Sequence, residues 1–342
     1  MSSLKSQIIL LFILFAISCI ASASDSIKVY TPRIEGTIRG KYEYFTELEQ
    51  NRFQVRNARF SIQGKVARIT SYKAEIDLSD EGKTKMLDAF VKFQPQKWWS
   101  FTIGQQKVPF STDNLRSPHN FYFANRSFIG KQLINLRDVG ASLNFTNQKY
   151  IPFNFTFGLF NGLGLYSQDK PLDLNQMSYA GRVIFMPTNS IQFQINALTI
   201  NPDVIRINFY NIGVIYEVRN LTFEAEFLHK TYNSEILLDF IKTDSWLLQA
   251  IYDIPTPRLK NIRKISPLIR YDDMTRNKRY DVQNSSSINI KTDEARKRFT
   301  GGITFSLAKP FVNDIRLNYE RYFWTDGKAT DSKIVAEFVV HF

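Results

Sequence analysis

The sequence is almost without cysteine and histidine. Its single cysteine, Cys19, lies in an apolar segment near the N-terminus, so the remaining chain can form no disulfide and no thiolate metal site. Lipidation of Cys19 would need a lipobox, which residues 16–18 match poorly. The three histidines, His119, His229 and His341, lie outside any nucleophile motif, which argues against a hydrolase. We therefore expect no enzymatic activity, no metal and no cofactor.

Long hydrophobic runs are also lacking, which excludes a bundle of membrane-spanning helices. The only extended apolar run, Ile8 to Ile20, follows the basic residue Lys5 and precedes the small residues Ala21-Ser22-Ala23. Such a segment is typical of a secretory signal peptide, and it is too short to span a membrane as a helix. We predict a signal peptide over residues 1–23 and an exported mature chain over residues 24–342.

The charge of the chain is strongly positive but not concentrated. The formal net charge is +12, and charged residues make up 22% of the sequence. A nucleic-acid-binding protein would gather this charge on one domain or helix face, whereas here it is spread along the chain. We therefore expect no nucleic-acid partner, and instead small anions or an anionic membrane surface.

Alternating apolar and polar residues are the dominant pattern. From Lys333 to Phe342, apolar side chains at even positions oppose Lys333, Glu337 and His341, which predicts a strand with one apolar and one wet face. About sixteen such segments follow one another. They are Arg33–Phe45, Arg52–Val66, Tyr72–Leu78, Lys85–Gln94, Trp99–Lys107, Asp138–Thr146, Tyr150–Asn161, Gln176–Met186, Ser190–Thr199, Arg206–Val218, Leu221–Tyr232, Ser245–Ile254, Ile265–Asp273, Arg298–Leu307, Asn313–Phe323 and Lys333–Phe342.

These segments predict an all-β fold, a transmembrane up-and-down antiparallel β-barrel in a bacterial outer membrane. A soluble β-sandwich also alternates, but many of the segments reach ten residues or more, which suits a tilted membrane crossing. The connections alternate between tight turns, such as Arg219-Asn220, and long ones, such as Met274–Lys297. In the second strand the alternation slips near Arg56-Asn57, which indicates a β-bulge.

The longest connection, residues 108–137, is the third loop at the extracellular rim. A loop of this length is functional or disordered, and its aromatic residues, including Phe110, Tyr122 and Phe128, favour packing. We expect it to fold into the barrel and narrow it, although an ordered cap at the surface is an alternative. Its basic residues Arg116, Arg126 and Lys131 then lie beside the channel, together with Arg137.

Several short motifs carry a resemblance to a known family. Arg52 to Lys65 resembles the arginine-rich second strand of the phosphate- and polyphosphate-selective outer-membrane porins. Gly104 to Ser111, the element around Arg126, and Arg137-Asp138-Val139-Gly140 resemble that family's strand end, third-loop element and sixth-strand entry. Arg270-Tyr271-Asp272 resembles a further element, so that the similarity runs from about Tyr30 to Phe342.

The resemblance implies a sixteen-stranded barrel, a homotrimer, a constricting third loop and anion conduction lined by arginines. It implies that Arg56, Arg126 and the acidic Asp77 face the channel. The sequence departs from the pattern at Asn57, where phosphate-selective members have another arginine. It also lacks the lysine expected near Asn114 and has Pro118 where a second serine would lie. These departures leave open whether the preferred anion is phosphate or another small anion.

The sequence predicts a passive channel for small hydrophilic solutes that prefers anions. Arginine can replace part of the hydration shell of an anion with a permanent charge and a planar fork of donors. The predicted pore-lining and anion-binding residues are Arg39, Arg56, Arg59, Lys73, Asp77, Lys92, Arg116, Arg126, Lys131 and Arg270. Two alternatives remain. Single wall arginines can form structural salt bridges, for example Arg56 or Arg59 with Asp77, and the barrel can be a surface adhesin without an open lumen.

Overall fold

The computed structural model describes most of the chain after residue 29. The described residues are 30–80, 82–133, 137–149, 152–162, 164, 168, 171–173, 176–201, 206–233, 242–284, 287–307, 311–325 and 331–342. The predicted signal peptide, residues 1–23, and residues 134–136 of the third loop lie outside them. The predictions made for those segments stay predictions.

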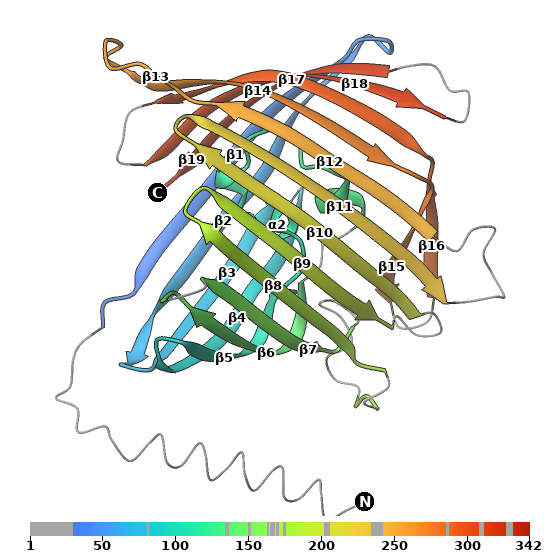
Figure 1. Cartoon of the computed structure of the whole chain (residues 1–342). Coiled ribbons are helices and arrows are strands. Elements are labelled where there is room, and N and C mark those ends of the chain that lie inside the picture. Colours follow the sequence, from blue (N-terminus) through green and yellow to red (C-terminus); the bar gives the residue numbers. More distant parts are fainter. Residues whose placement is uncertain are drawn as a thin grey trace, which may run out of the picture.

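One antiparallel sheet closes on itself and forms the wall (Figure 1). Sixteen strands make this wall, as predicted, and a short strand, β13 (Ile254–Pro255), pairs with β14 beyond the end of β12. The sixteen are β1 (Arg33–Phe45), β2 (Gln50–Ala67), β3 (Thr70–Asp80), β4 (Lys83–Gln96), β5 (Trp99–Lys107), β6 (Arg137–Asn147), β7 (Phe153–Phe160), β8 (Ser178–Thr188), β9 (Ile191–Ile200), β10 (Arg206–Val218), β11 (Leu221–Asn233), β12 (Lys242–Tyr252), β14 (Ile262–Met274), β17 (Arg296–Leu307), β18 (Val312–Trp324) and β19 (Asp331–His341).

The first and last strands complete the ring. β1 pairs with β2 on one side and with β19 on the other, where Gly40 lies opposite Phe338. Gly36 and Phe342 exchange two backbone hydrogen bonds, of 2.8 and 3.0 Å. Among the described strands of the wall, closure therefore leaves no unpaired edge, and this is the condition for a sheet to span a lipid bilayer.

The side chains of β19 show how the wall separates lipid from lumen. Ile334 and Phe338 point outward and keep 47% and 48% of their surface exposed, while Val335 and Val339 on the other face are fully buried. A large apolar side chain on the outer face of a barrel contacts lipid, so its exposure here carries no hydrophobic penalty. The alternation predicted from the sequence therefore corresponds to these two faces.

The predicted bulge in the second strand is confirmed. The register between β1 and β2 passes from Arg39 opposite Asn57 to Gly40 opposite Val55, so that Arg56 has no partner in this ladder. An extra residue changes the phase of alternation by one, which explains why the apolar face of the strand shifts at this point.

The long connection after β14 contains a hairpin that the sequence did not predict. It is formed by β15 (Asn277–Asn284) and β16 (Ser287–Asp293), which pair only with each other. Apolar alternation does occur in it, at Tyr280 and Val282 in β15 and at Ile288 and Ile290 in β16, which are cross-strand partners. It extends over too few residues for a membrane crossing, so it did not mark these segments as strands of the wall.

The third loop lies within the ring of strands (Figure 1). Its described part, residues 108–133, is called the lumenal loop below, and it contains α2 (Thr112–Leu115), the 3₁₀ turn η1 (Pro118–Asn120) and the π-helical turn η2 (Ile129–Leu133). Phe110, Phe128 and Ile129 pack with wall residues that include Phe209 and Leu228. Among the described residues, no helix is both long and apolar enough to cross a membrane.

Candidate functional site

The start of the lumenal loop is hydrogen-bonded to β11. The backbone N–H of Thr112 donates to the Glu226 carboxylate at 3.0 Å, and the Arg116 guanidinium donates to Glu224 at 2.5 Å. The two glutamates lie two residues apart in one strand, so both side chains are on its lumenal face. Arg116, predicted to line the channel, is thus held by a wall carboxylate.

Four arginines from three parts of the chain interact across the space beside the loop. They are Arg126 in the loop, Arg56 and Arg59 in β2, and Arg137 at the start of β6, and we call them the arginine cluster. Burial lowers the pKa of Arg126 to about 10. The nearby Asp113 opposes this decrease, whereas the positive charges of the other three arginines add to it. The loop therefore presents a cation toward a wall that is itself cationic.

Carboxylates of β3 and β4 hold three members of the cluster. The ion pairs are Arg56 with Asp80 at 2.5 Å, Arg59 with Asp77 at 2.9 Å and Arg137 with Asp88 at 2.7 Å. The arginine side chains keep between 13% and 16% of their surface exposed. They are consequently accessible to a small solute while their orientation is fixed. Arg59 forms the salt bridge with Asp77 that was considered as an alternative, whereas Arg56 pairs with Asp80.

A basic cavity of about 330 Å³ lies on the extracellular side of the lumenal loop, and we call it the outer chamber. Nine of its lining residues are lysines or arginines, among them Arg52, Arg126 and Lys333, and only Glu43 and Asp331 are acidic. Several of these cations lie over aromatic rings, as Arg296 does over Trp324 at 5.0 Å. An anion that enters from outside meets this positive surface before it reaches the loop.

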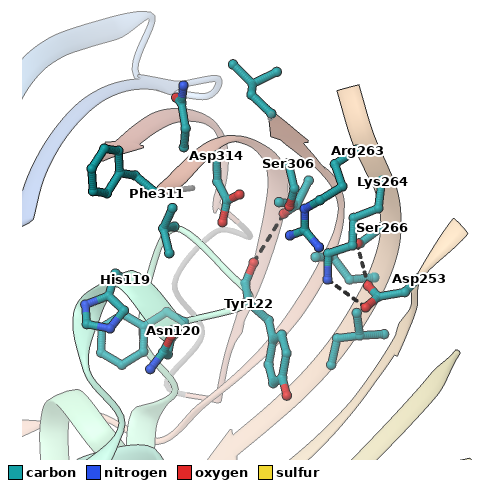
Figure 2. Close-up of a pocket in the computed structure, with 17 residues that line it drawn as sticks. His119, Asn120, Tyr122, Asp253, Arg263, Lys264, Ser266, Ser306, Phe311 and Asp314 are labelled. Atoms are coloured by element: carbon teal, nitrogen blue, oxygen red, sulfur yellow. Dashed lines mark hydrogen bonds and ion pairs between the residues drawn. The ribbon is translucent and has the colours of Figure 1, made fainter. Parts of the chain in front are cut away.

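A second cavity, of about 320 Å³, lies on the periplasmic side of the loop and has a different charge (Figure 2). Tyr122 of the loop lines it, and Lys264 and Ser266 converge on Asp253, each at 2.6 Å. Arg263 and Lys264 are opposed by two aspartates, so the cations here are balanced. Of these two cavities, only the outer chamber has an excess of positive charge.

The remaining predicted site residues lie in three different settings. Lys131 lines the outer chamber. Lys73 contacts Glu75 at 2.6 Å and Asp88 at 3.0 Å, and Lys92 lies in β4 between Ser71 and Thr102 of the neighbouring strands.

Two further predicted residues, Arg39 and Arg270, are covered by the lumenal loop. Their exposures are 2% and 3%. Their side chains donate to backbone carbonyls of the loop, at 2.7 Å and 2.9 Å.

The structure also identifies two basic residues that bind the lumenal loop and were not in the predicted set of site residues. Lys107, the last residue of β5, donates to the carbonyls of Leu115 and Arg116 at 2.9 and 3.0 Å. Arg316 binds Glu337 at 2.9 Å and the carbonyl of His119 at 3.0 Å. Alternation within each strand was the signal available for Arg316, because it places charged residues on the lumenal face. No local pattern could indicate which part of the loop they would meet.

Comparison with known families and structures gives a consistent result. The family model described as phosphate-selective porin O and P matches residues 34–202, which confirms the predicted family over that range. The Arg270-Tyr271-Asp272 element lies beyond the match. The sequence has no significant similarity to a curated protein.

Solved structures share the fold at low sequence identity. OmpT of Vibrio cholerae, an outer membrane protein in a trimer form, superposes with a TM-score of 0.62 at 10% identity, over 92% of this chain and 100% of that chain. An anion-selective porin from Comamonas acidovorans gives 0.62 at 12%, over 92% and 99%. OprB of Pseudomonas putida gives 0.62 at 9%, over 91% and 93%. This chain therefore has the fold of a porin barrel.

Proposed function

We propose, for a chain whose residues 34–202 belong to the phosphate-selective porin O and P family, that the barrel is an outer-membrane channel for passive diffusion with a preference for small anions. The observation that carries the proposal is the arginine cluster, in which Arg126 of the loop and Arg56 of β2 line one basic chamber, while wall carboxylates hold Arg59 and Arg137 within electrostatic reach of Arg126. Anions pass between the loop and the wall formed by β2 to β5. The channel carries out no covalent chemistry.

The chemistry of the cluster suits transient binding of anions. A guanidinium group offers directed donors and a permanent charge, which offset the loss of hydration as an anion enters the narrow part of the channel. The partners of the cluster, Asp77, Asp80 and Asp88, reduce its net positive charge. Binding is consequently weak enough for the anion to leave, as conduction requires.

We propose a broad anion preference in place of strict phosphate selectivity. Asn57 stands where phosphate-selective relatives carry an arginine, and it is fully engaged on the lumenal wall. Its side chain accepts from Arg39 at 3.1 Å and donates to Asp77 at 2.6 Å. It therefore adds a neutral link between a cation and a carboxylate, and no further positive charge.

We also propose that the functional unit is a homotrimer. OmpT of Vibrio cholerae, which shares this fold, is described in a trimer form. The outer surface of β1, β2, β18 and β19 supplies an apolar hollow for association, lined by Gly40, Phe53, Ile315 and Phe338. The rest of the apolar outer surface contacts lipid.

The reversal potential of the purified protein in a salt gradient across a planar bilayer tests the channel and its preference. We expect open channels and a potential that favours anions. Arg126→Glu is expected to reduce anion conductance by about tenfold or more, because a unit charge at about 6 Å from the ion is worth about 3 kcal/mol at an effective dielectric constant of about 20, on the order of a hundredfold in the occupancy of the site. The matched control is Arg258→Glu, in an exposed turn between β13 and β14.

Each result has a distinct meaning. A reversal potential that favours cations contradicts the proposed anion preference but not the proposal that the barrel is an open channel. Equal effects of the two substitutions place the narrowest point away from Arg126. Absence of current from a folded barrel favours the adhesin alternative over a channel.

A further inference from the structure

Three consecutive carbonyl groups of the lumenal loop, at residues 124–126, bind three arginines of the wall. Arg39 of β1 donates to the first at 2.7 Å, Arg270 of β14 to the second at 2.9 Å, and Arg298 of β17 to the third at 2.8 Å. The strands that carry these arginines are far apart in the sequence, and the closed barrel brings them to one side of the loop. We call these three residues the arginine clamp.

Each arginine of the clamp is itself oriented by a carboxylate of the wall. Arg39 pairs with Glu337 at 2.5 Å, and Asp272 pairs with Arg270 at 2.8 Å and with Arg298 at 2.7 Å. The exposed fractions of the three arginine side chains are only 2%, 2% and 4%. A guanidinium group with a fixed carboxylate on one side and a fixed carbonyl on the other leaves the loop backbone little freedom.

Aromatic residues of the loop cover the clamp. The ring of Phe121 lies 5.3 Å from the guanidinium of Arg39, that of Phe123 lies 4.4 Å from Arg270, and that of Phe128 lies 4.7 Å from Arg298. Arg39 and Arg298 also line the outer chamber, yet the three clamp arginines keep only 2%, 2% and 4% of their side-chain surface exposed. Carboxylates and loop carbonyls occupy their donors, so they are less accessible to a passing anion than Arg56, Arg59 and Arg137, which keep between 13% and 16% exposed.

The segment that the clamp holds is the one that positions Arg126. Residues 121–127 lie between the turns η1 and η2 and form no helix or strand, so hydrogen bonds within the segment do not fix its distance from the wall. A hydrogen bond between uncharged groups also holds this segment, because the backbone N–H of Ala124 donates to the Asn318 side chain at 2.8 Å. The carbonyl bound by Arg298 belongs to Arg126 itself.

We propose that Arg39, Arg270 and Arg298 are positioning residues that set the aperture of the channel by holding the loop backbone against the wall. This inference rests on the proposed function, because it assumes a conducting gap on the opposite side of the loop. It assigns different roles to two sets of arginines. The cluster attracts anions, and the clamp fixes the width of the gap in which the cluster acts.

Size exclusion by neutral polymers tests the aperture without depending on anion preference. Arg298→Gln removes the charge and shortens the side chain that reaches the carbonyl of residue 126. We expect the polymer cut-off to shift to a larger size and the anion preference to fall. The matched control is Arg59→Gln, which removes the same charge from a wall residue whose bonds are to Asp77 and Glu75. We expect this control to lower anion conductance with an unchanged cut-off.

A second variant keeps the test decisive if Arg298→Gln does not fold. Asn318→Ala deletes a neutral bond to the same segment and leaves every charge in place, so a larger cut-off with it reports the position of the loop alone. Folding of each variant is checked by its migration in an unheated detergent gel. An unchanged cut-off in folded Arg298→Gln, or in folded Asn318→Ala, overturns the proposal. If the unsubstituted protein shows no preference for anions, the proposed function is overturned instead.

Discussion

Arg56 and Arg59 are close in sequence, yet different structural causes direct their side chains into the lumen. Arg59 lies in the regular ladder between β2 and β3, opposite Asp77, and binds it at 2.9 Å. Arg56 occupies the bulge and reaches Asp80 at the end of β3. Without the bulge, strict alternation would direct Arg56 and Arg59 to opposite faces. One extra residue therefore brings a second cation into the cluster.

The surroundings of His119 predict that docking of the lumenal loop depends on pH. Its ring stacks on that of His341 with centroids 3.6 Å apart, and the Thr37 hydroxyl lies within 3.4 Å of its Nδ1. Burial, and then the charges of His341 and Arg316, lower the pKa of His119 from 6.5 to about 4. At a pH between about 4 and 6.5, the imidazole of His119 binds a proton when the loop is away from the wall, but not when the loop is docked on it. Docking of the loop is thus strongest above pH 6.5 and weakens as the pH falls toward 4.

We expect the single-channel current to become noisier as the pH falls through this window, because the loop then leaves the wall more often. His119→Phe keeps an aromatic ring against His341 but cannot bind a proton, and should remove the response. His229→Phe is the control, since His229 contacts Asp244 of the neighbouring strand. An acid response that survives in His119→Phe would assign it to another group.

At the scale of elements, strands were predicted more reliably than connections. β1, β5 and β10 have the predicted ends, because a strand between lipid and water must alternate over the whole crossing. The hairpin β15–β16 was missed because its apolar alternation covers only a few residues in each strand. The lumenal loop was predicted in part. Its aromatic residues indicated packing, but the surfaces on which they pack come from strands distant in sequence.

The pairing of β4 with β5 depends on a glycine. Gly104 has a positive φ of 125°, and a Cβ atom there would lie 2.3 Å from the carbonyl oxygen of Ala89. Gly104→Ala is therefore expected to lower the free energy of unfolding by about 1–3 kcal/mol, the range for a strained backbone position. Gly301→Ala is the control, because a Cβ atom on this glycine of β17 meets nothing within 4 Å. Urea unfolding in detergent measures both, and equal midpoints would contradict the steric argument.

At the scale of the whole molecule, closure of the barrel determines whether the chain can reside in a membrane. Val339 of β19 pairs with Arg39 of β1 and with Asp314 of β18, so it belongs to the ladder on both sides. Val339→Pro should abolish the compact form seen in an unheated detergent gel, because proline cannot donate in a central strand. Val339→Ala shortens the side chain and preserves the backbone, and is expected to fold. A compact Val339→Pro barrel would show that this ladder is dispensable.

The sequence by itself determined that the chain is a barrel, where most strands run and which face of each meets lipid. It could do so because alternation has a period of two residues and is imposed locally by lipid on one side and water on the other. It also predicted a set of lumenal arginines. Only the tertiary structure separated those that keep part of their surface exposed, such as Arg59, from those buried against the loop, such as Arg39 and Arg270. That division arises because closure of the ring brings β1, β14 and β17 around a loop that leaves the wall after β5.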